Sequence, residues 1–280
     1  MTDEKAESAP GQHSLPSSKG RVAWRGSSMR HATSLYQDPP TDFSWVTQGA
    51  VNPPIDQRDC ESCYAIATLG GLEGAFKIRT GSLARFSTQQ VVDCSEDYGN
   101  RGCYGGGKPN TLSYVFSDGI VSDAAYPYTA KEEECQEITK DKDKQCLQAG
   151  DLDLGKSIVI DENQLDRLFT ELINGPIVVS VDADTPQWRR YTGGILADFY
   201  CNGEPKHTVL LVGYGVEKNT SYWLLRNNRG PKWGEGGYVR IFRDPNANTG
   251  PGFCNIMAKP AFRPVLADKM KATACRDKDS

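Results

Sequence analysis

Residues 57–66 read QRDCESCYAI, and the two cysteines of this stretch decide how the chain is interpreted. Cys60 and Cys63 stand three positions apart, a spacing found in metal sites, in redox pairs and beside some cysteine nucleophiles. From Cys63 onward apolar residues recur at helical spacing as far as Phe76, and Gly81 supplies an end signal. We therefore expect Cys63 to begin a helix.

A metal site and a redox pair are the weaker interpretations of the two cysteines. A tetrahedral zinc site needs further ligands, but no second CxxC occurs, and His13 and His31 lie in the N-terminal segment. We expect neither a metal nor a cofactor. A redox CxxC usually follows a strand of a βαβ unit, whereas the residues before Cys60 are proline-rich and irregular.

A nucleophilic role is the third interpretation of Cys63. The unpaired amides at a helix start favour a thiolate over a thiol. A thiolate nucleophile works with an imidazole, which in turn needs a group to orient it. His207 is the only histidine outside the N-terminal segment, and Asn227 ends a strand-like stretch. A lone histidine beside apolar residues is more often a core residue, but Cys, His and Asn together match the logic of Cys-His-Asn hydrolases.

Local patterns predict helices in the first half of the domain and strands in the second. Helices are expected from Cys63 toward Gly81, from the capping pair Ser87 and Gln90 toward Cys94, over 109–117 and over 165–173. Strands are expected at IVVSVDA (177–183), HTVLLVGYG (207–215), SYWLLRNN (221–228) and GYVRIF (237–242). This order predicts an α+β chain with two segregated lobes.

The composition limits the classes of protein. Of the 280 residues 38% are hydrophobic and 24% charged, and the net charge of −4 argues against a general affinity for nucleic acid. No apolar run is long enough to span a membrane. Residues 1–42, rich in Ser, Pro, Gly and charge, predict a flexible segment or pro-segment remnant without a signal-peptide core. Residues 266–280 predict a charged, frayed tail, which leaves 43–265 as the domain.

With these motifs in place, the sequence resembles the papain-like cysteine peptidases, the family of papain and the lysosomal cathepsins. The family's text around its nucleophile, close to GAVTPVKNQGSCGSCWAF, aligns without a gap with GAVNPPIDQRDCESCYAI (49–66). Further matches follow in the family's order: FSTQQVVDC (86–94), GCYGG (102–106), YPY (126–128), KHTVLLVGYG (206–215) and YWLLRNNRGPKWGEGGYVRI (222–241). The resemblance implies a two-lobed fold, one lobe mainly helical and the other β-barrel-like, with an active-site cleft between them.

The resemblance also implies an activity and its residues. Cys63 would be the nucleophile, His207 its proton partner, Asn227 the residue that holds the imidazole and Gln57 a donor to the oxyanion. Substrate backbone would bind along Gly105 and Gly106. The implied protein is a monomeric endopeptidase without a cofactor, with peptide or protein substrates and cystatin-like inhibitors as partners.

The same resemblance implies disulfide partners for six of the cysteines. By family position the pairs are Cys60–Cys103, Cys94–Cys135 and Cys201–Cys254, and Cys63 stays free. Cys146 and Cys275 remain and could form an extra bridge across the lobes. Disulfides and the sequon Asn219-Thr220-Ser221 imply a glycoprotein that is lysosomal, vacuolar or secreted.

Several positions depart from the family pattern. Arg229 replaces a Trp that shields the His–Asn hydrogen bond; its aliphatic stem could cover that bond, but its charge would weaken the Cys–His pair. Lys206 replaces an Asp before the histidine, and the three added charges of Lys206, Lys108 and Lys259 would depress the pKa of His207 if they stayed close. Glu61 replaces Gly beside the first substrate pocket, where it either favours a basic residue before the cleaved bond or points to solvent. The neighbouring pocket is predicted to be lined by Lys108, Ser180, Thr208 and Lys259.

These departures keep two further questions open. Two lysines in a normally apolar pocket favour an acidic or compact substrate side chain, unless both ammonium groups turn outward. The alternative function is a weakened or inactive homologue that binds peptides or proteins without cleaving them. A reduced redox protein would instead require a disulfide between Cys60 and Cys63.

Overall fold

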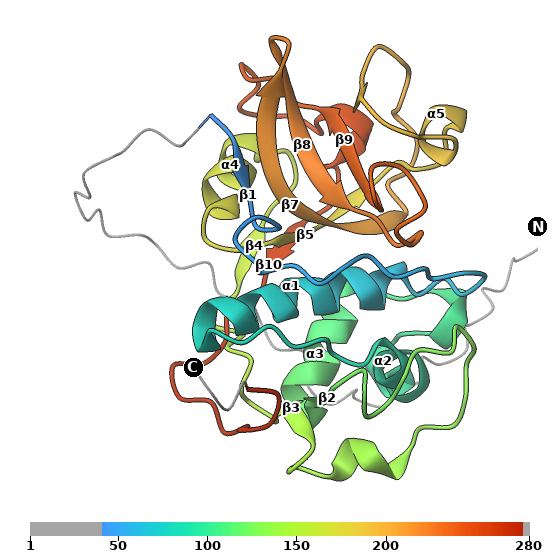
Figure 1. Cartoon of the computed structure of the whole chain (residues 1–280), viewed down its shortest axis with the longest axis vertical. Coiled ribbons are helices and arrows are strands. Elements are labelled where there is room, and N and C mark those ends of the chain that lie inside the picture. Colours follow the sequence, from blue (N-terminus) through green and yellow to red (C-terminus); the bar gives the residue numbers. More distant parts are fainter. Residues whose placement is uncertain (1–40, 277–280) are drawn as a thin grey trace, which may run out of the picture. The chain divides into compact units, whose positions relative to one another are not determined.

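A computed structural model describes residues 41–276 of the chain, so nearly all of the predicted flexible segment lies outside the described residues. The helices are α1 (Cys63–Thr80), α2 (Thr88–Cys94), α3 (Lys108–Asp118), α4 (Leu165–Leu172) and α5 (Pro186–Arg189). The strands are β1 (Phe43–Ser44), β2 (Ile120–Val121), β3 (Gln145–Leu147), β4 (Ile158–Ile160), β5 (Ile177–Val181), β6 (Ile195–Leu196), β7 (His207–Glu217), β8 (Thr220–Arg226), β9 (Tyr238–Phe242) and β10 (Ala261–Arg263). Figure 1 shows α1, α2 and α3 gathered in one lobe, and most strands with α4 and α5 in the other.

The four expected helices and four expected strands are confirmed, with ends shifted by a few residues at most. Helix α1 ends at Gly81, whose φ of 82° is in the left-handed region that favours glycine. Ser87 caps α2 by accepting a hydrogen bond from the Gln90 N–H at 3.0 Å. The side chain of Gln90 does not complete the capping box, because its Oε1 accepts from the Val121 N–H at 2.9 Å and the Ser87 N–H donates to the Val121 carbonyl instead.

The main sheet runs in the order β4-β10-β5-β7-β8-β9-β6, and β1 pairs with β7. Its path is open among the described residues, so the sheet does not close into a barrel. The pairs β5–β7 and β7–β8 are antiparallel and bring Val181 opposite His207 and Leu210 opposite Arg226. The α+β fold with two segregated lobes is therefore confirmed. The first residues of β7 and the last residues of β8 lie side by side at the same end of this strand pair.

Strand β5 shows how one sheet serves two cores. Val178 belongs to the apolar cluster that includes α1, α2 and α3, whereas Ile177, Val179 and Val181 belong to a second cluster with α4. Successive side chains of a strand point to opposite faces. Because both faces of β5 are covered, all five of its residues are apolar or buried, and α1 packs directly onto the sheet.

Helix α1 packs against the sheet at two residues that lack side chains. A Cβ on Gly71 would lie 2.8 Å from Cγ2 of Val178, and a Cβ on Gly70 would overlap the guanidinium of Arg226. That guanidinium is buried, donates to the Ile66 carbonyl at 3.2 Å, and lies 3.7 Å from the Glu73 carboxylate. Arg226 therefore ties the last residue of β8 to the first half of α1.

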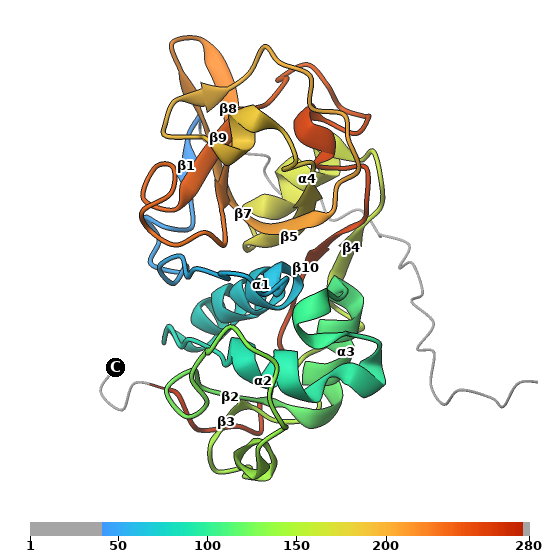
Figure 2. The same cartoon turned by 90° about the vertical axis from the view of Figure 1, so that its right-hand side faces the viewer.

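The C-terminal tail differs from its prediction as far as residue 276. Cys275 forms a disulfide with Cys146, and the Ala272 N–H donates to the Asp151 carboxylate at 2.9 Å. Both cysteines belong to the cluster of the helical lobe, and the tail runs beside β2 and β3 in both views (Figure 2). The prediction of a frayed tail is wrong for these residues, and the extra bridge lies within one lobe rather than across two.

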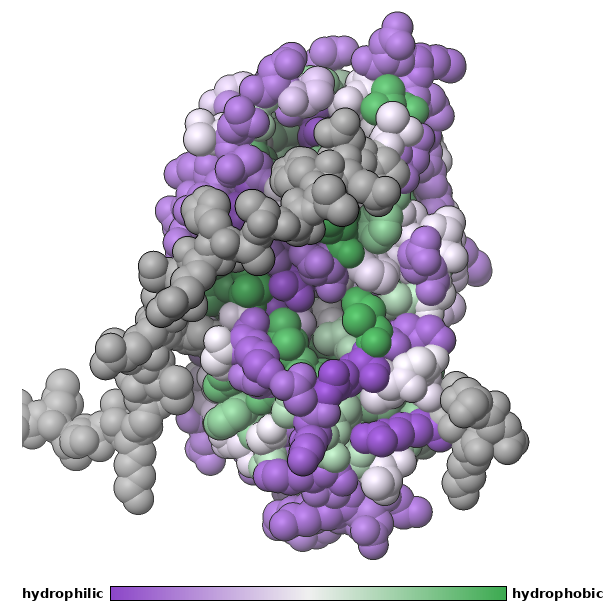
Figure 3. Space-filling model, turned by 90° about the vertical axis from the view of Figure 1, so that its left-hand side faces the viewer, coloured by the Kyte–Doolittle hydropathy of each residue, from purple (hydrophilic) through white to green (hydrophobic). Residues whose placement is uncertain are grey.

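Polar residues cover most of one face of the molecule, and apolar residues appear there as separate patches (Figure 3). Among residues 41–276 no helix has the length and apolar character that a membrane span requires. Asn219 of the sequon is exposed in the turn between β7 and β8. Its glycosylation stays a prediction.

Replacing Arg226 with methionine tests the contact between the lobes. Arg226→Met leaves the buried Glu73 carboxylate without its cation, and we expect the free energy of unfolding in urea to fall by about 3–5 kcal/mol. The double variant Arg226→Met/Glu73→Gln should recover part of this loss, since no lone charge remains. Arg189→Met, which removes an exposed arginine paired with Asp184, should cost less than about 1 kcal/mol. A loss of similar size in both single variants would contradict the assignment.

Candidate active site

Cys63 is the first residue of α1, and all eight other cysteines lie in disulfides. Ser62 precedes it at the cap position, but its hydroxyl does not cap the helix and instead lies 2.6 Å from the Tyr128 hydroxyl. The first amides of a helix have no partner within it and carry partial positive charge. Cys63, which is partly exposed, therefore places its sulfur at the start of the helix, in an environment that favours a thiolate.

His207 and Asn227 meet at the ends of two paired strands. His207 begins β7, and Asn227 directly follows β8. His207 Nε2 lies 2.7 Å from Oδ1 of Asn227, and the Asn228 N–H donates to the same oxygen at 2.9 Å. Because an amide oxygen only accepts, Nε2 carries the hydrogen, and Nδ1 is left for the sulfur of Cys63. Asn227 is fully buried, which fixes the orientation of the imidazole.

Cys63 and His207 shift each other's pKa in opposite directions. Burial by itself raises the pKa of the Cys63 thiol, but the hydrogen bond and charge of His207 outweigh burial, and the pKa is lowered. Burial by itself lowers the pKa of His207, but the hydrogen bond and charge of Cys63, joined by Asn227, raise it. The site therefore favours a thiolate beside an imidazolium. Thr208 also hydrogen-bonds the sulfur, a contact that no sequence pattern indicated.

Gln57 is held in the loop before α1 by its backbone and its side chain. Its N–H donates to the Asn228 carbonyl at 2.9 Å, and its carbonyl accepts from the Tyr128 hydroxyl at 3.0 Å. Its side-chain amide donates to the Cys60 carbonyl at 3.1 Å. The amide thus lies beside the turn that leads into Cys63. Tyr128 belongs to a matched motif, but nothing in the sequence indicated this contact.

Two positions beside this loop require glycine, one for its backbone conformation and the other because a neighbouring ring packs closely against it. Gly105 has φ of 101°, and a Cβ on Gly106 would lie 2.6 Å from the Tyr64 ring. Glu61 faces this segment: its N–H donates to the Cys103 carbonyl at 3.0 Å, and its carboxylate lies 3.6 Å from where a Cβ of Gly105 would be. Glu61 is exposed, so its charge lies over Gly105 and reaches solvent as well.

The two pocket lysines differ from each other. Lys108 is only 7% exposed, and its ammonium donates to Ser180 Oγ and to the Pro260 carbonyl, each at 2.8 Å. Burial lowers the pKa of Lys108 to about 7. Lys259 has a side chain that is 42% exposed and lies 3.6 Å from the Glu204 carboxylate. The outward orientation considered for both lysines therefore applies only to Lys259.

Arg229, which stands where the family has a shielding Trp, is exposed. A different aromatic residue, Trp188, packs beside His207. The ring of Trp188, fully buried, lies edge-on at 6.4 Å between centroids from the imidazole. Arg229 lowers the pKa of His207, as expected, but Cys63 and Asn227 outweigh this effect. The weaker Cys–His pair expected from Arg229 stays a prediction. Trp188 was not identified from the sequence, since it lies in the short helix α5, outside the matched motifs.

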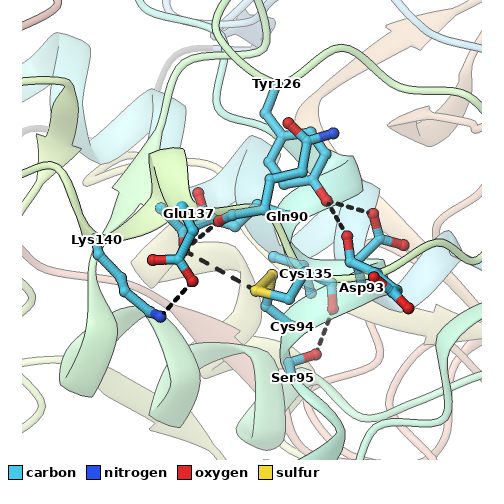
Figure 4. The surroundings of a disulfide bond; sticks show 12 residues. Gln90, Asp93, Cys94, Ser95, Tyr126, Cys135, Glu137 and Lys140 are labelled. Atoms are coloured by element: carbon cyan, nitrogen blue, oxygen red, sulfur yellow. Dashed lines mark hydrogen bonds and ion pairs between the residues drawn. A yellow bond between two sulfur atoms is a disulfide. The ribbon is translucent and has the colours of Figure 1, made fainter.

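The disulfides brace the segments around the site. Three pairs are those that the resemblance implies: Cys60–Cys103, Cys94–Cys135 and Cys201–Cys254. The first joins the loop before Cys63 to the segment before Gly105, which differs from the Cys60–Cys63 bond that a redox pair requires. Figure 4 shows Cys94–Cys135 beside the hydrogen bond from the Tyr126 hydroxyl to the Asp93 carboxylate, at 2.6 Å. No group of metal-binding side chains occurs among the described residues.

Comparison with known proteins gives one consistent result. A family model described as papain family cysteine protease matches residues 39–263. A cathepsin L-like proteinase of Phaedon cochleariae is 37% identical over 229 residues, covering 81% of this chain and 66% of that protein. Cathepsin S of Mus musculus is 36% identical over 214 residues, covering 75% of this chain and 61% of that protein. The chain thus spans less than two thirds of the length of these two relatives.

Solved structures agree with the sequence relatives. The Carica candamarcensis cysteine protease CMS1MS2, in complex with E-64, has a TM-score of 0.70 and 30% identity, covering 81% of this chain and 99% of that one. The proform of the ragweed pollen allergen Amb a 11, a cysteine protease, has a TM-score of 0.73 and 31% identity, covering 84% of this chain and 69% of that one. The fold of these proteins is therefore that of this chain.

Removing the charge of Arg229 should extend the pH range of the Cys63–His207 pair. Arg229→Gln takes away a guanidinium that lowers the pKa of His207, so that pKa should rise further. The alkaline limit of Cys63 alkylation by iodoacetate, an anion that the imidazolium attracts, should move to higher pH, and by less at high salt because Arg229 is exposed. Lys140→Gln, which removes an exposed lysine paired with Glu137, should leave the limit in place. An unchanged or lower limit in Arg229→Gln would contradict this reasoning.

Proposed function

Because the chain belongs to the papain family of cysteine proteases, we propose that it is a cysteine-type endopeptidase that acts through Cys63, His207 and Asn227. The observation that best supports the proposal is the 2.7 Å hydrogen bond between His207 and Asn227, combined with the opposite pKa shifts of Cys63 and His207. A nucleophile, its acid–base partner and an orienting group are what thiol acyl transfer requires.

The reaction follows from the positions of these groups. The thiolate of Cys63 attacks the peptide carbonyl carbon, and the oxygen becomes an oxyanion. The Cys63 N–H and the side-chain amide of Gln57 are the proposed donors to that oxyanion, and one such donor typically contributes about 3 kcal/mol. His207 gives its proton to the leaving amine, which leaves an acyl group on the sulfur. A water then attacks this thioester while His207 takes its proton, and the acid product leaves with the thiolate restored.

Asn227 acts through His207 rather than on substrate. By holding Nε2 it keeps Nδ1 aimed at the sulfur, so the same ring atom receives and returns the proton. The backbone bond from Gln57 to Asn228 keeps the oxyanion donor in register with this imidazole. We propose that the extended segment at Gly105 and Gly106 binds the substrate backbone.

The alternative function, a peptide-binding homologue without activity, gains no support from the departures at Arg229 and Glu61. Both side chains are exposed, and the bond between His207 and Asn227 is intact beside them. Peptide or protein substrates follow from the proposed reaction. Four disulfides fit an oxidising compartment, whereas a lysosomal or secreted location, a monomeric state and binding of cystatin-like inhibitors stay predictions.

Single substitutions test the proposed reaction. We expect an epoxide that alkylates active-site thiolates to label Cys63 with one-to-one stoichiometry, and Cys63→Ser and His207→Ala to abolish both labelling and peptide hydrolysis. Gln57→Ala should lower kcat by roughly 100- to 1,000-fold, because one oxyanion donor is lost. Gln48→Ala, at an exposed glutamine, should change neither. Correctly folded protein that is not labelled and cleaves no peptide of an internal-cleavage library would refute the proposal.

A second substitution tests the charge beside Gly105. We propose that Glu61 favours a basic side chain on the residue that donates the cleaved carbonyl, because its carboxylate lies over that segment. Glu61→Gln should reduce the preference for arginine over its neutral analogue citrulline by several-fold, at most about tenfold for an exposed pair. Glu96→Gln, at an exposed glutamate of the helical lobe, serves as the control. If wild type and Glu61→Gln prefer arginine over citrulline equally, Glu61 only faces solvent and does not select the substrate.

A further inference from the structure

Lys108 holds a buried positive charge at the boundary between the lobes. It is the first residue of α3 and follows the segment Gly105–Gly107. Its ammonium reaches out of the helical lobe to Ser180 on β5 and to the carbonyl of Pro260, just before β10. A lysine is almost never fully buried without a charged partner, so this position needs a physical explanation.

The charge of Lys108 has no counter-ion among the described residues. Its two acceptors, a hydroxyl and a carbonyl, are neutral, and no described carboxylate lies within ion-pair distance of its Nζ. An ammonium has three N–H donors, of which these two bonds use two, and the ring of Phe262, with its centroid 5.6 Å from Nζ, is a further neutral neighbour. The nearby Lys259 adds repulsion, while its own charge is paired with Glu204.

This ammonium is linked to the reacting groups through Ser180 and Thr208. Ser180, which accepts from Lys108, pairs with Thr208 across β5 and β7. Thr208 hydrogen-bonds the sulfur of Cys63, and the charges of Lys108 and Cys63 act on each other. A peptide bound for attack by Cys63 would therefore place a nearby side chain beside Lys108.

We propose that Lys108 is a specificity-determining residue that selects peptides with an acidic side chain at the second residue before the cleaved bond. The proposal rests on the proposed peptidase function of the same site. A substrate carboxylate would accept the remaining N–H of Lys108 and supply the missing counter-ion, whereas an uncharged side chain would leave the ammonium unneutralised.

A purely structural role predicts a different result. If Lys108 only links α3 to β5 and the loop before β10, its removal lowers stability but does not change the choice between an acidic and an amide side chain. Glutamate and glutamine have nearly the same size, so the ratio of their affinities isolates the charge. This ratio is the quantity to measure.

Peptide binding to full-length Cys63→Ala protein tests the proposal without requiring turnover. Two peptides that differ only by Glu or Gln at the second residue before the expected cleavage site are titrated by calorimetry at pH 6. The Glu peptide should bind at least about tenfold more tightly, the effect of one charge-assisted hydrogen bond. Adding Lys108→Met should reduce the ratio to within about twofold. Lys206→Met, which removes an exposed charge, should keep it.

The pH dependence provides a second readout. The pKa of Lys108 is lowered to about 7 with Cys63 in place, and the charge of Cys63 raises it, so in Cys63→Ala the charge of Lys108 should be lost at a somewhat lower pH. The Glu-to-Gln ratio should therefore fall as the pH rises from 6 to 8.5, while Lys108→Met should show no such fall. A ratio near one at pH 6, or a ratio that survives in Lys108→Met, would overturn the proposal.

Failure of this proposal is distinguishable from failure of the peptidase function. If Cys63 is labelled by an epoxide and peptides are cleaved without preference for Glu over Gln, the peptidase function stands and the role of Lys108 falls. If the Glu peptide binds selectively but no peptide is cleaved by the wild type, the selectivity of Lys108 stands and the peptidase function falls.

Discussion

The buried guanidinium of Arg226 is the contact on which the geometry of the site depends. It ends β8, one residue before Asn227, and it donates to the Ile66 carbonyl in the first turn after Cys63. Cys63 belongs to the helical lobe and Asn227 to the sheet lobe, so their relative position is set wherever the lobes are joined. Gly70 leaves the space that the guanidinium fills, and Glu73 supplies the opposite charge. Arg226, Gly70 and Glu73, which take no part in the reaction, thus hold the reacting residues in position.

The pKa values of two positive groups near Cys63 shift in opposite directions, although burial lowers both. For His207 the cost of burial is overcome, because the thiolate and the amide oxygen of Asn227 stabilise the charged ring, and its pKa is raised. For Lys108 burial prevails, because only neutral acceptors surround it, and its pKa is lowered to about 7. The same desolvation therefore produces an ion pair in one place and an unneutralised charge in the other. We connect the first with the reaction and the second with the choice of substrate.

The helices, the long strands and the order of motifs were predictable from local patterns, since α4 and β8 have clear apolar periods, β5 and β7 are continuous apolar runs, and α1 has a clear end signal. The short strands β4, β6 and β10 have no period of their own and form by pairing with distant strands. Counting cysteines identified Cys146 and Cys275 as leftovers but could not place them in one lobe. The sequence likewise could not distinguish Lys108 from Lys259, because burial of a side chain depends on residues far along the chain.

The central claim is that His207 keeps Cys63 as a thiolate, and the pH titration of that thiolate tests it most directly. Its formation can be followed by ultraviolet difference absorbance in the folded wild type and in His207→Ala. We expect the wild-type thiolate to form below the ordinary cysteine pKa of about 8.5, and the His207→Ala thiol to titrate near or above that value, because burial is then opposed only by the hydrogen bonds of Thr208. A wild-type thiol that titrates at about 8.5, or is unaffected by the loss of His207, would contradict the account.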